Sequence, residues 1–288
     1  MDIILNRICQ IEQHPIHKWL NDKIHGKKEK KIIVVANVSA GKSTLINALV
    51  GLRINRTKMT ACTNRLMYIH NMCCPDGIIA KRIDGSYCYF DDLSELDYDS
   101  IIEAAFPFKS TLKKQPICFI DTPGINNAED SNHRCVTEKA INTGDYDIVI
   151  YVSNGLYFGT NDEHNLLKYL RRNVRKPIIF VLNRLDEFDS EQDSIAKMLK
   201  DYKSELKKMG FKRPTIVPIS AYASFLFRID SSLTCKTEER KKHEIKELFE
   251  EDYYDFPTYI GCGKSKDLLT KTGIETLENK ILTLKTAQ

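Results

Sequence analysis

The chain has 288 residues, of which 42% are hydrophobic and 28% are charged. These proportions exclude a disordered tail, a collagen-like repeat and a small disulfide-stabilised secreted protein. The 43 basic and 39 acidic residues are interspersed, so the net charge of +4 does not by itself indicate a nucleic-acid-binding protein.

The nine cysteines form no CxxC pair and show no zinc-ligand spacing. Cys73 and Cys74 are adjacent, which is too close for an easy bridge between them. Because the opening residues lack the pattern of a secretory signal, we expect free thiols and a cytoplasmic protein, at most peripheral at a membrane. The longest apolar runs are strand-sized and fall short of the ~20 residues that a membrane-spanning helix requires.

The first 29 residues carry apolar side chains at helical spacing, in two stripes separated by Pro15. The stripes are formed by Ile4, Ile8 and Ile11, and by Ile16, Trp19, Leu20 and Ile24. A lysine-rich stretch over 27–31 then indicates a solvated linker. We therefore predict an N-terminal helical segment over 1–29 and a larger domain over 30–288.

From residue 30 onward, short apolar runs alternate with helical patterns. Strands are predicted over 32–36, 117–120, 148–152, 178–182 and 215–219. Helices are predicted over 42–50, 161–172 and 190–209. Near-continuous apolar strands are typical of a parallel sheet covered on both faces, so the predicted fold is a doubly wound, mostly parallel α/β sheet.

Further elements are predicted around this core. A strand over 66–69 is expected at an antiparallel edge, and residues 78–90 are expected to form a hairpin. Residues 236–251 mix both charge signs and indicate a solvated helix. A closing amphipathic helix is expected within 270–288. Its apolar positions are Ile274, Leu277, Ile281 and Leu284.

The most specific motif is the run ANVSAGKS over 36–43, which follows a predicted strand and opens a predicted helix. Such a loop presents backbone N–H groups and a helix N-terminus to a phosphate chain. Gly41 lets the backbone approach the phosphates, Lys42 offers them a cation, and the Ser43 hydroxyl can ligate magnesium. The residues predicted to bind the phosphate-bearing ligand are Asn37, Val38, Ser39, Ala40, Gly41, Lys42, Ser43 and Thr44.

Ala36 stands where such a loop usually has its first glycine. If the backbone φ at this position is positive, alanine costs about 1 kcal/mol or more. If φ has an ordinary strand value, that cost vanishes.

The second motif is DTPG over 121–124, directly after the apolar run that ends at residue 120. A carboxylate at Asp121 can hold the water shell of a magnesium ion, and the Gly124 N–H can contact a γ-phosphate. Alone, a DxxG pattern is as often a turn. At this distance behind a phosphate loop it becomes specific.

The third motif is NRLD over 183–186, at the end of another apolar strand. The Asp186 carboxylate can accept hydrogen bonds from the ring N–H and the exocyclic amine of guanine, a donor pair that adenine lacks. Asn183 belongs to the same motif, and Arg184, which replaces the commoner lysine, can lay its guanidinium plane over the purine. Ser220 and Ala221 follow the next strand, where backbone N–H groups can face the guanine carbonyl.

Together these motifs resemble those of the dynamin family, especially bacterial dynamin-like proteins, over roughly residues 32–284. The runs that carry the resemblance are VSAGKSTLINAL at 38–49, DTPGINN at 121–127, YVSN at 151–154, GTND at 159–162 and TGI at 272–274, with Leu277 and Glu278. The resemblance implies a Ras-like P-loop G domain with short flanking helices, which binds and hydrolyses GTP with magnesium.

The resemblance also implies roles for single residues. Thr63 falls where dynamin-like proteins place their magnesium- and water-binding threonine, and Thr60 is the alternative. Ser39 matches a phosphate-loop serine that helps to recruit a monovalent cation, whereas Val38 departs from the glutamine of eukaryotic dynamins. Ile125 occupies the place of the water-orienting glutamine of Ras-type enzymes. The expected catalytic residues are Ser39, Lys42, Thr63 and Gly124, and the expected magnesium ligands are Ser43, Thr63 and Asp121.

The expected partners follow from the same resemblance. We expect a nucleotide-dependent dimer and a membrane lipid or a stalk-bearing partner, with no specific nucleic acid. The alternatives are a Ras- or Era-like regulatory switch that acts on a protein or RNA partner, and a GTP-binding scaffold without hydrolysis. The chain stops soon after its GTPase-like part, so both a piece of a longer protein and a minimal stand-alone member remain open.

One cluster outside these motifs contains possible metal ligands. His70, Cys73 and Cys74 lie close together in the sequence, but no second cluster of ligands matches them. We therefore predict that they are loop residues.

Overall fold

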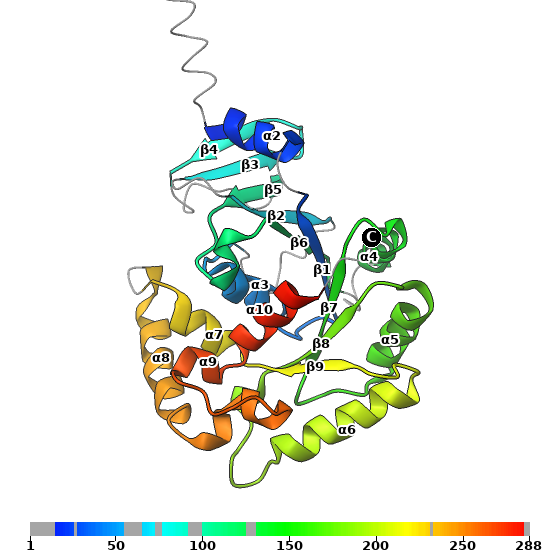
Figure 1. The fold of residues 1–288 in the computed structure, drawn as a ribbon, viewed down its shortest axis with the longest axis vertical. Coiled ribbons are helices and arrows are strands. Elements are labelled where there is room, and N and C mark those ends of the chain that lie inside the picture. The colour runs from blue at the N-terminus through cyan, green and yellow to red at the C-terminus, as the bar shows by residue number, and fades with distance from the viewer. Residues whose placement is uncertain are drawn as a thin grey trace, which may run out of the picture.

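The computed structural model describes residues 15–25, 28–54, 65–72, 77–91, 100–124, 131–230 and 233–284. Nine strands form one sheet in the order β4-β3-β5-β2-β6-β1-β7-β8-β9, and helices cover both of its faces (Figure 1). Most of the strand pairs are parallel. The predicted doubly wound, mostly parallel α/β sheet is confirmed.

Five strands form the parallel half of the sheet, and they match the predicted apolar runs. They are β1 (Lys30–Ala36), β6 (Ile117–Asp121), β7 (Ile148–Asn154), β8 (Ile178–Asn183) and β9 (Thr215–Pro218). Their side chains are almost all buried, because helices lie against both faces. All five strands point the same way, so their carboxyl ends share one edge of the sheet.

The other half of the sheet begins with β2 (Met67–Asn71), which is antiparallel to β6. Beyond β2 lie β5 (Ile101–Phe106), β3 (Ile78–Arg82) and β4 (Tyr87–Phe90), with β3 and β4 paired as a hairpin. The antiparallel strand and the hairpin are confirmed. The prediction of an edge position for the first strand is wrong, because three more strands extend the sheet past it.

Two sequence predictions about this half need correction. Strand β5 was not expected, because Glu103 interrupts its apolar run and the two alanines that follow have low strand propensity. His70 lies in β2 and is buried, so it is not a loop residue. Cys73 and Cys74 lie outside the described residues.

The helices of the described residues are α2 (Pro15–His25), α3 (Lys42–Val50), α4 (Ser131–Thr143), α5 (Asn161–Asn173), α6 (Ile195–Lys208), α7 (Ala221–Arg228), α8 (Lys236–Leu248), α9 (Leu268–Lys271) and α10 (Ile274–Thr283). The predicted helix over 190–209 begins only at Ile195, because the Ser194 hydroxyl accepts a hydrogen bond from Lys197 N and caps the helix. The helix predicted as solvated is α8, which is largely exposed and buries Ile245. Helix α4 was not predicted.

Helix α10 is the predicted closing helix, and it is anchored to distant parts of the chain. It buries Ile274, Leu277 and Ile281. Glu278 is buried in an ion pair with Arg228, 2.5 Å away, and the Lys30 ammonium donates to the carbonyls of Ile281 and Leu284 at 3.0 and 2.9 Å. These contacts join the end of the described chain to β1 and α7.

Helix α2 confirms part of the predicted N-terminal helical segment. Trp19 is buried against Met72, Ile79 and Ala105, so α2 covers the antiparallel half of the sheet (Figure 1). Residues 1–14 lie outside the described residues, and the division of the chain at residue 30 stays a prediction. Among the described helices, none combines the length and the apolar character that crossing a bilayer would take.

Candidate nucleotide site

The predicted phosphate loop joins the end of β1 to the start of α3. Among the described residues other than glycine, only Ser39 and Arg184 have a positive φ. Ala36 therefore has an ordinary backbone conformation, and alanine in place of the usual glycine causes no strain there. Ser39 (φ 65°) and Gly41 (φ 89°) instead make the left-handed turns of the loop. Gly41 caps α3 without a side chain, so the first N–H groups of the helix remain for an anion.

The Asn183 side chain ties this loop to two other motifs. The residue ends β8 and is only 2% exposed. Its amide nitrogen donates to Ala40 O at 2.9 Å, and its amide oxygen accepts from Ala221 N at 2.9 Å. One buried amide therefore fixes the phosphate loop and the start of α7 relative to β8. The structure thus shows a side chain that positions two loops; that Asn183 also contacts the ligand stays a prediction.

Asp121 and Gly124 lie beside the phosphate loop, as the order of the motifs predicted. The Lys42 ammonium forms an ion pair with the Asp121 carboxylate. A Cβ at Gly124 would lie 3.2 Å from the Val38 side chain, so the DTPG turn packs closely against the loop. The Thr122 hydroxyl donates to Val34 O at 2.8 Å and holds this turn to β1.

The NRLD motif places a carboxylate in a mostly buried position. Asp186 lies in the short 3-10 helix η3 (Leu185–Glu187), directly after β8. Burial raises the pKa of Asp186, and a hydrogen bond with Ser220 partly opposes that effect. Two N–H donors from a bound base would stabilise the charged carboxylate, so the site suits a ligand that supplies them.

Arg184 extends from the same motif to the phosphate loop. Its backbone is left-handed, with φ 68°, and its Nη1 donates to Ser39 O at 3.4 Å. Its Nε also donates to Glu187 at 2.6 Å, so the guanidinium is held on both sides. The position agrees with the expectation that this side chain lies next to the ligand.

The backbone N–H groups of Ser220 and Ala221 have partners within the protein. Ser220 N donates to Thr272 O at 3.0 Å, and Ala221 N donates to Asn183. The Ser220 hydroxyl caps α7 by accepting from Ala223 N at 3.0 Å. That these two N–H groups face a guanine carbonyl stays a prediction. Thr272 belongs to a run that carried the family resemblance, and its carbonyl holds this loop by accepting from Ser220 N. Sequence reasoning missed this supporting role.

A buried acid that the sequence did not single out supports the loop after β7. Glu163 is 4% exposed and accepts hydrogen bonds from Ser153 Oγ at 2.5 Å and from Gly159 N at 2.6 Å. The loop also touches the NRLD motif, because Gly155 N donates to Asn183 O at 2.8 Å. The only signal in the sequence was the neighbouring GTND run.

The donors predicted for magnesium fit a hard cation in part. Ser43 lies in the first turn of α3, and Asp121 lies next to that turn through its contact with Lys42. Hydroxyl and carboxylate oxygens are ligands that magnesium prefers. Thr63 and Thr60 lie outside the described residues, so the choice between them stays a prediction.

The family model of the dynamin family matches residues 32–185, which is more than half of the chain. Among curated proteins, GTPase Era of Haemophilus influenzae is 27% identical over 192 residues, covering 66% of this chain and 48% of that protein. GTPase Era of Halothermothrix orenii is 27% identical over 194 residues, covering 66% and 49%. The chain thus spans about half the length of the curated relatives it matches.

A solved structure of an oligomerised bacterial dynamin pair superposes on 95% of this chain and 37% of that chain. Its TM-score is 0.52 and its sequence identity 16%, so this likeness shows the fold alone. Aquifex aeolicus Era covers 76% of this chain and 57% of that chain, with a TM-score of 0.40 and 20% identity.

Gly41→Ala is expected to abolish nucleotide binding while the protein stays folded. The new Cβ would lie 2.3 Å from Asn183 Nδ2, so the amide that positions two loops must move. Gly85→Ala is the matched control, because its φ of 87° is equally left-handed and no atom lies within 4 Å of the new Cβ. Both variants should lose about 1 kcal/mol of unfolding free energy from backbone strain. Titration with a fluorescent GTP analogue checks the difference, and unchanged binding by Gly41→Ala would contradict the role of Asn183.

Proposed function

Since the chain belongs to the dynamin family, we propose that it binds GTP and hydrolyses it to GDP and phosphate with magnesium. One observation carries this proposal: the motifs for phosphate, magnesium and base contact one another at a single edge of the sheet. Lys42 contacts Asp121, Asn183 joins Ala40 to Ala221, and Asp186 contacts Ser220. Segments far apart in the sequence thereby line one site.

The phosphate loop supplies charge stabilisation for phosphoryl transfer. Lys42 and the N-terminus of α3 are directed to the negative charge that spreads over the γ-phosphate oxygens. With a nucleotide bound, Lys42 would contact the phosphates in place of Asp121, and the Asp121 carboxylate would then be available to the metal shell. Ser43, Thr63 and Asp121 would hold magnesium, which would supply further neutralisation of the phosphate charge. Gly124, beside Val38, offers its N–H to the γ-phosphate.

The attacking water needs to be positioned, not strongly activated, because phosphoryl transfer proceeds through a loose transition state. Ile125 cannot orient a water by hydrogen bonding, so we assign this task to Thr63 and backbone groups. Ser39 would hold a monovalent cation, which would add positive charge beside the phosphates. The Ser39 carbonyl already accepts from Arg184, so this turn of the loop faces cationic groups.

Hydrolysis is slow in the monomer and faster when two GTP-loaded domains pair across their nucleotides. Pairing orders the loops around the phosphates and excludes water from them. One solved structure that matches 95% of this chain is an oligomerised bacterial dynamin pair. This likeness supports self-association.

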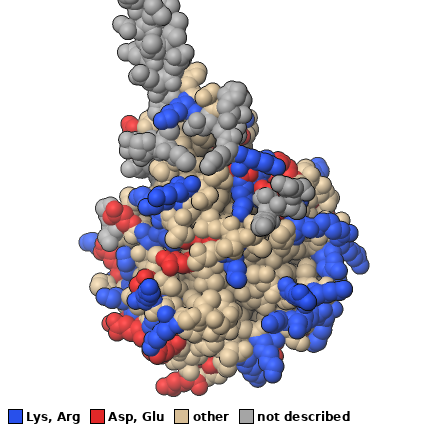
Figure 2. Space-filling model, in the orientation of Figure 1, with Lys and Arg blue, Asp and Glu red and all other residues tan. Residues whose placement is uncertain are grey.

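The target of the GTPase is an anionic membrane surface. A basic face, defined by six residues, lies at the amino ends of β8 and β9, opposite the nucleotide edge; Figure 2 shows Lys and Arg gathered on this side, over α5 and α6. The basic face consists of Arg171, Arg172, Arg175, Lys176, Lys212 and Arg213. Among the described residues, none of the six forms an ion pair with a carboxylate. Part of the face is a cleft of about 320 Å³ with Phe180 and Phe211 among its lining.

Charge and family together favour lipid over RNA as the partner of this face. Each basic residue near an anionic membrane contributes about 1 kcal/mol of attraction. The dynamin pair that resembles this chain in fold senses and tethers membranes. The curated relatives are Era GTPases, so an Era-like switch with an RNA partner is the second candidate.

Asp186→Asn is expected to weaken GTP binding by about 3 kcal/mol or more, a hundredfold, because two hydrogen bonds to a charged acceptor are lost. The amide should favour a xanthine nucleotide, whose C2 carbonyl accepts where guanine donates. Competition binding with GTP, XTP and ATP measures the change, and Asp201→Asn, on the exposed face of α6, is the control.

GTP affinity of the native protein should also fall on acidification, and at a higher pH than an ordinary aspartate would give. Burial raises the pKa of Asp186, and only the charged carboxylate accepts both hydrogen bonds. Unchanged guanine selectivity in Asp186→Asn would refute the assignment.

GTP turnover per molecule is expected to rise with protein concentration and to level off once dimers predominate. Phosphate release at saturating GTP measures it over a wide dilution series. Lys42→Ala, which removes the cation for the phosphates, should show neither binding nor turnover. A specific activity that stays constant on dilution would exclude pairing. An absence of steady turnover in the native protein would instead support a GTP-binding scaffold without hydrolysis.

The double variant Lys176→Glu/Arg213→Glu is expected to lose co-sedimentation with phosphatidylserine-containing liposomes and to keep GTP binding. The pair Lys241→Glu/Lys242→Glu on α8, away from the basic face, is the charge-matched control. Co-sedimentation should also weaken steeply with salt. Binding to structured RNA together with indifference to liposomes would favour the Era-like function instead.

A further inference from the structure

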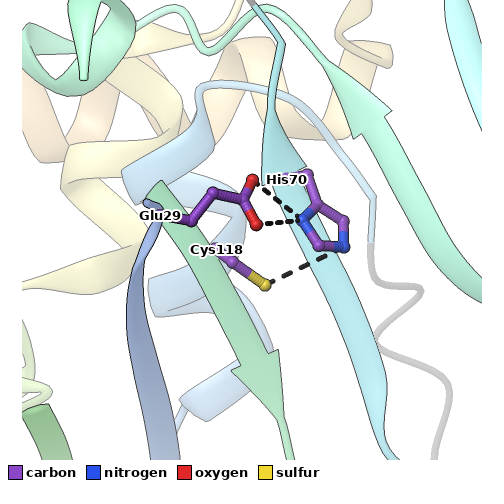
Figure 3. A group of neighbouring side chains, drawn as sticks. All are labelled: Glu29, His70 and Cys118. Atoms are coloured by element: carbon purple, nitrogen blue, oxygen red, sulfur yellow. Dashed lines mark hydrogen bonds and ion pairs between the residues drawn. The ribbon is translucent and has the colours of Figure 1, made fainter. Parts of the chain in front are cut away.

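His70 is buried in β2 between a thiol and a carboxylate (Figure 3). It lies directly opposite Cys118 in the antiparallel pair of β2 and β6, and Cys118 Sγ is 3.9 Å from His70 Nε2. On the other side of the ring, both carboxylate oxygens of Glu29 lie 3.0 Å from Nδ1. One ligand atom of each residue lies within 4.8 Å of the other two.

We propose that Glu29, His70 and Cys118 form a binding site for Zn²⁺, separate from the nucleotide site. Sulfur, nitrogen and oxygen donors in one group are typical of zinc, whereas magnesium and calcium take oxygen ligands. A thiolate and a carboxylate carry together the charge that balances one divalent cation beside a neutral imidazole. In tetrahedral coordination, donors around zinc are about 3.3–3.8 Å apart. An ion would bind one nitrogen of His70, so side-chain rotations must bring the Glu29 oxygen and the Cys118 sulfur to the same side of the ring.

The surroundings supply an enclosed site with one more donor. Trp19 of α2 packs edge-on against the His70 ring, with 5.6 Å between the ring centres, and the Tyr68 ring stacks beside it at 6.5 Å. The Glu103 carboxylate lies 3.7 Å from His70 Nε2 and could supply a further oxygen ligand, although it also contacts Lys81 at 3.6 Å. The Glu29 side chain is 21% exposed, which leaves an ion a path from solvent.

A bound ion would connect three parts of the chain that local structure does not connect. Glu29 precedes β1, His70 is the second-last residue of β2, and Cys118 lies in β6, three residues before Asp121. The ion would fix the segment that follows α2 onto the sheet. It would also reinforce the β2–β6 pair at the junction of the parallel and antiparallel halves.

Cobalt(II) titration of the full chain, purified with chelator under reducing conditions, tests the proposal. We expect a thiolate-to-cobalt charge-transfer band at one equivalent, tetrahedral visible bands, and displacement of both by Zn²⁺. Cys118→Ser should abolish the charge-transfer band, and Glu29→Gln should weaken cobalt binding about tenfold or more. Cys135→Ser, an exposed cysteine of α4, is the control and should retain the full spectrum.

Two further readouts keep the test decisive if Cys118→Ser does not fold. Zn²⁺ should raise the thermal unfolding temperature of the native protein without nucleotide, and it should protect Cys118 from alkylation as read by mass spectrometry. GTP binding by the native protein is independent of these readouts, so their failure leaves the proposed GTPase untouched. A spectrum without a thiolate band, or a band that survives in Cys118→Ser and disappears in Cys73→Ser or Cys74→Ser, would overturn the site and leave Glu29 and His70 as a hydrogen-bonded pair.

Discussion

Parallel pairing of β1, β6, β7, β8 and β9 is the constraint on which the candidate site depends. Parallel strands in one sheet end on one side, so the loops that follow them converge whatever their separation in the chain. The buried Asn183 amide then converts that convergence into a fixed geometry, because its two hydrogen bonds hold the phosphate loop and the start of α7 at once. An amide buried at this depth is stable only with both partners in place, so the loops are positioned together.

The candidate site is accordingly held by buried polar groups that bond to its loops. Asn183, Thr272 and Glu163 are buried and bond to backbone or hydroxyl groups of the loops. In the proposed function, Lys42, Arg184 and Asp186 are the residues that would contact the nucleotide. Burial leaves Asp186 with a raised pKa and a need for donors. This division suits a GTPase, since phosphoryl transfer relies on positioned charge and needs little covalent chemistry from the protein.

The antiparallel half of the sheet gives the molecule a second region with its own chemistry. It is covered by α2 through Trp19, and its junction with the parallel half is the β2–β6 pair in which His70 faces Cys118. The nucleotide edge, this junction and the basic face at the opposite ends of β8 and β9 are thus three separate places on one sheet.

Local pattern was sufficient for the five parallel strands, α3, α5, α10 and the phosphate loop, because apolar periodicity and loop chemistry are properties of neighbouring residues. The same patterns missed β5, where Glu103 interrupts the apolar run, and α4, which has few apolar residues at helical spacing. They also placed β2 at an edge, since a strand's neighbours in a sheet are chosen by segments distant in the chain. By itself, the sequence determined the fold class and the dynamin-family motifs. Only the tertiary structure decided that Asn183 bonds two loops and that Glu29, His70 and Cys118 meet, because those contacts depend on strand order and register, which no local stretch of sequence encodes.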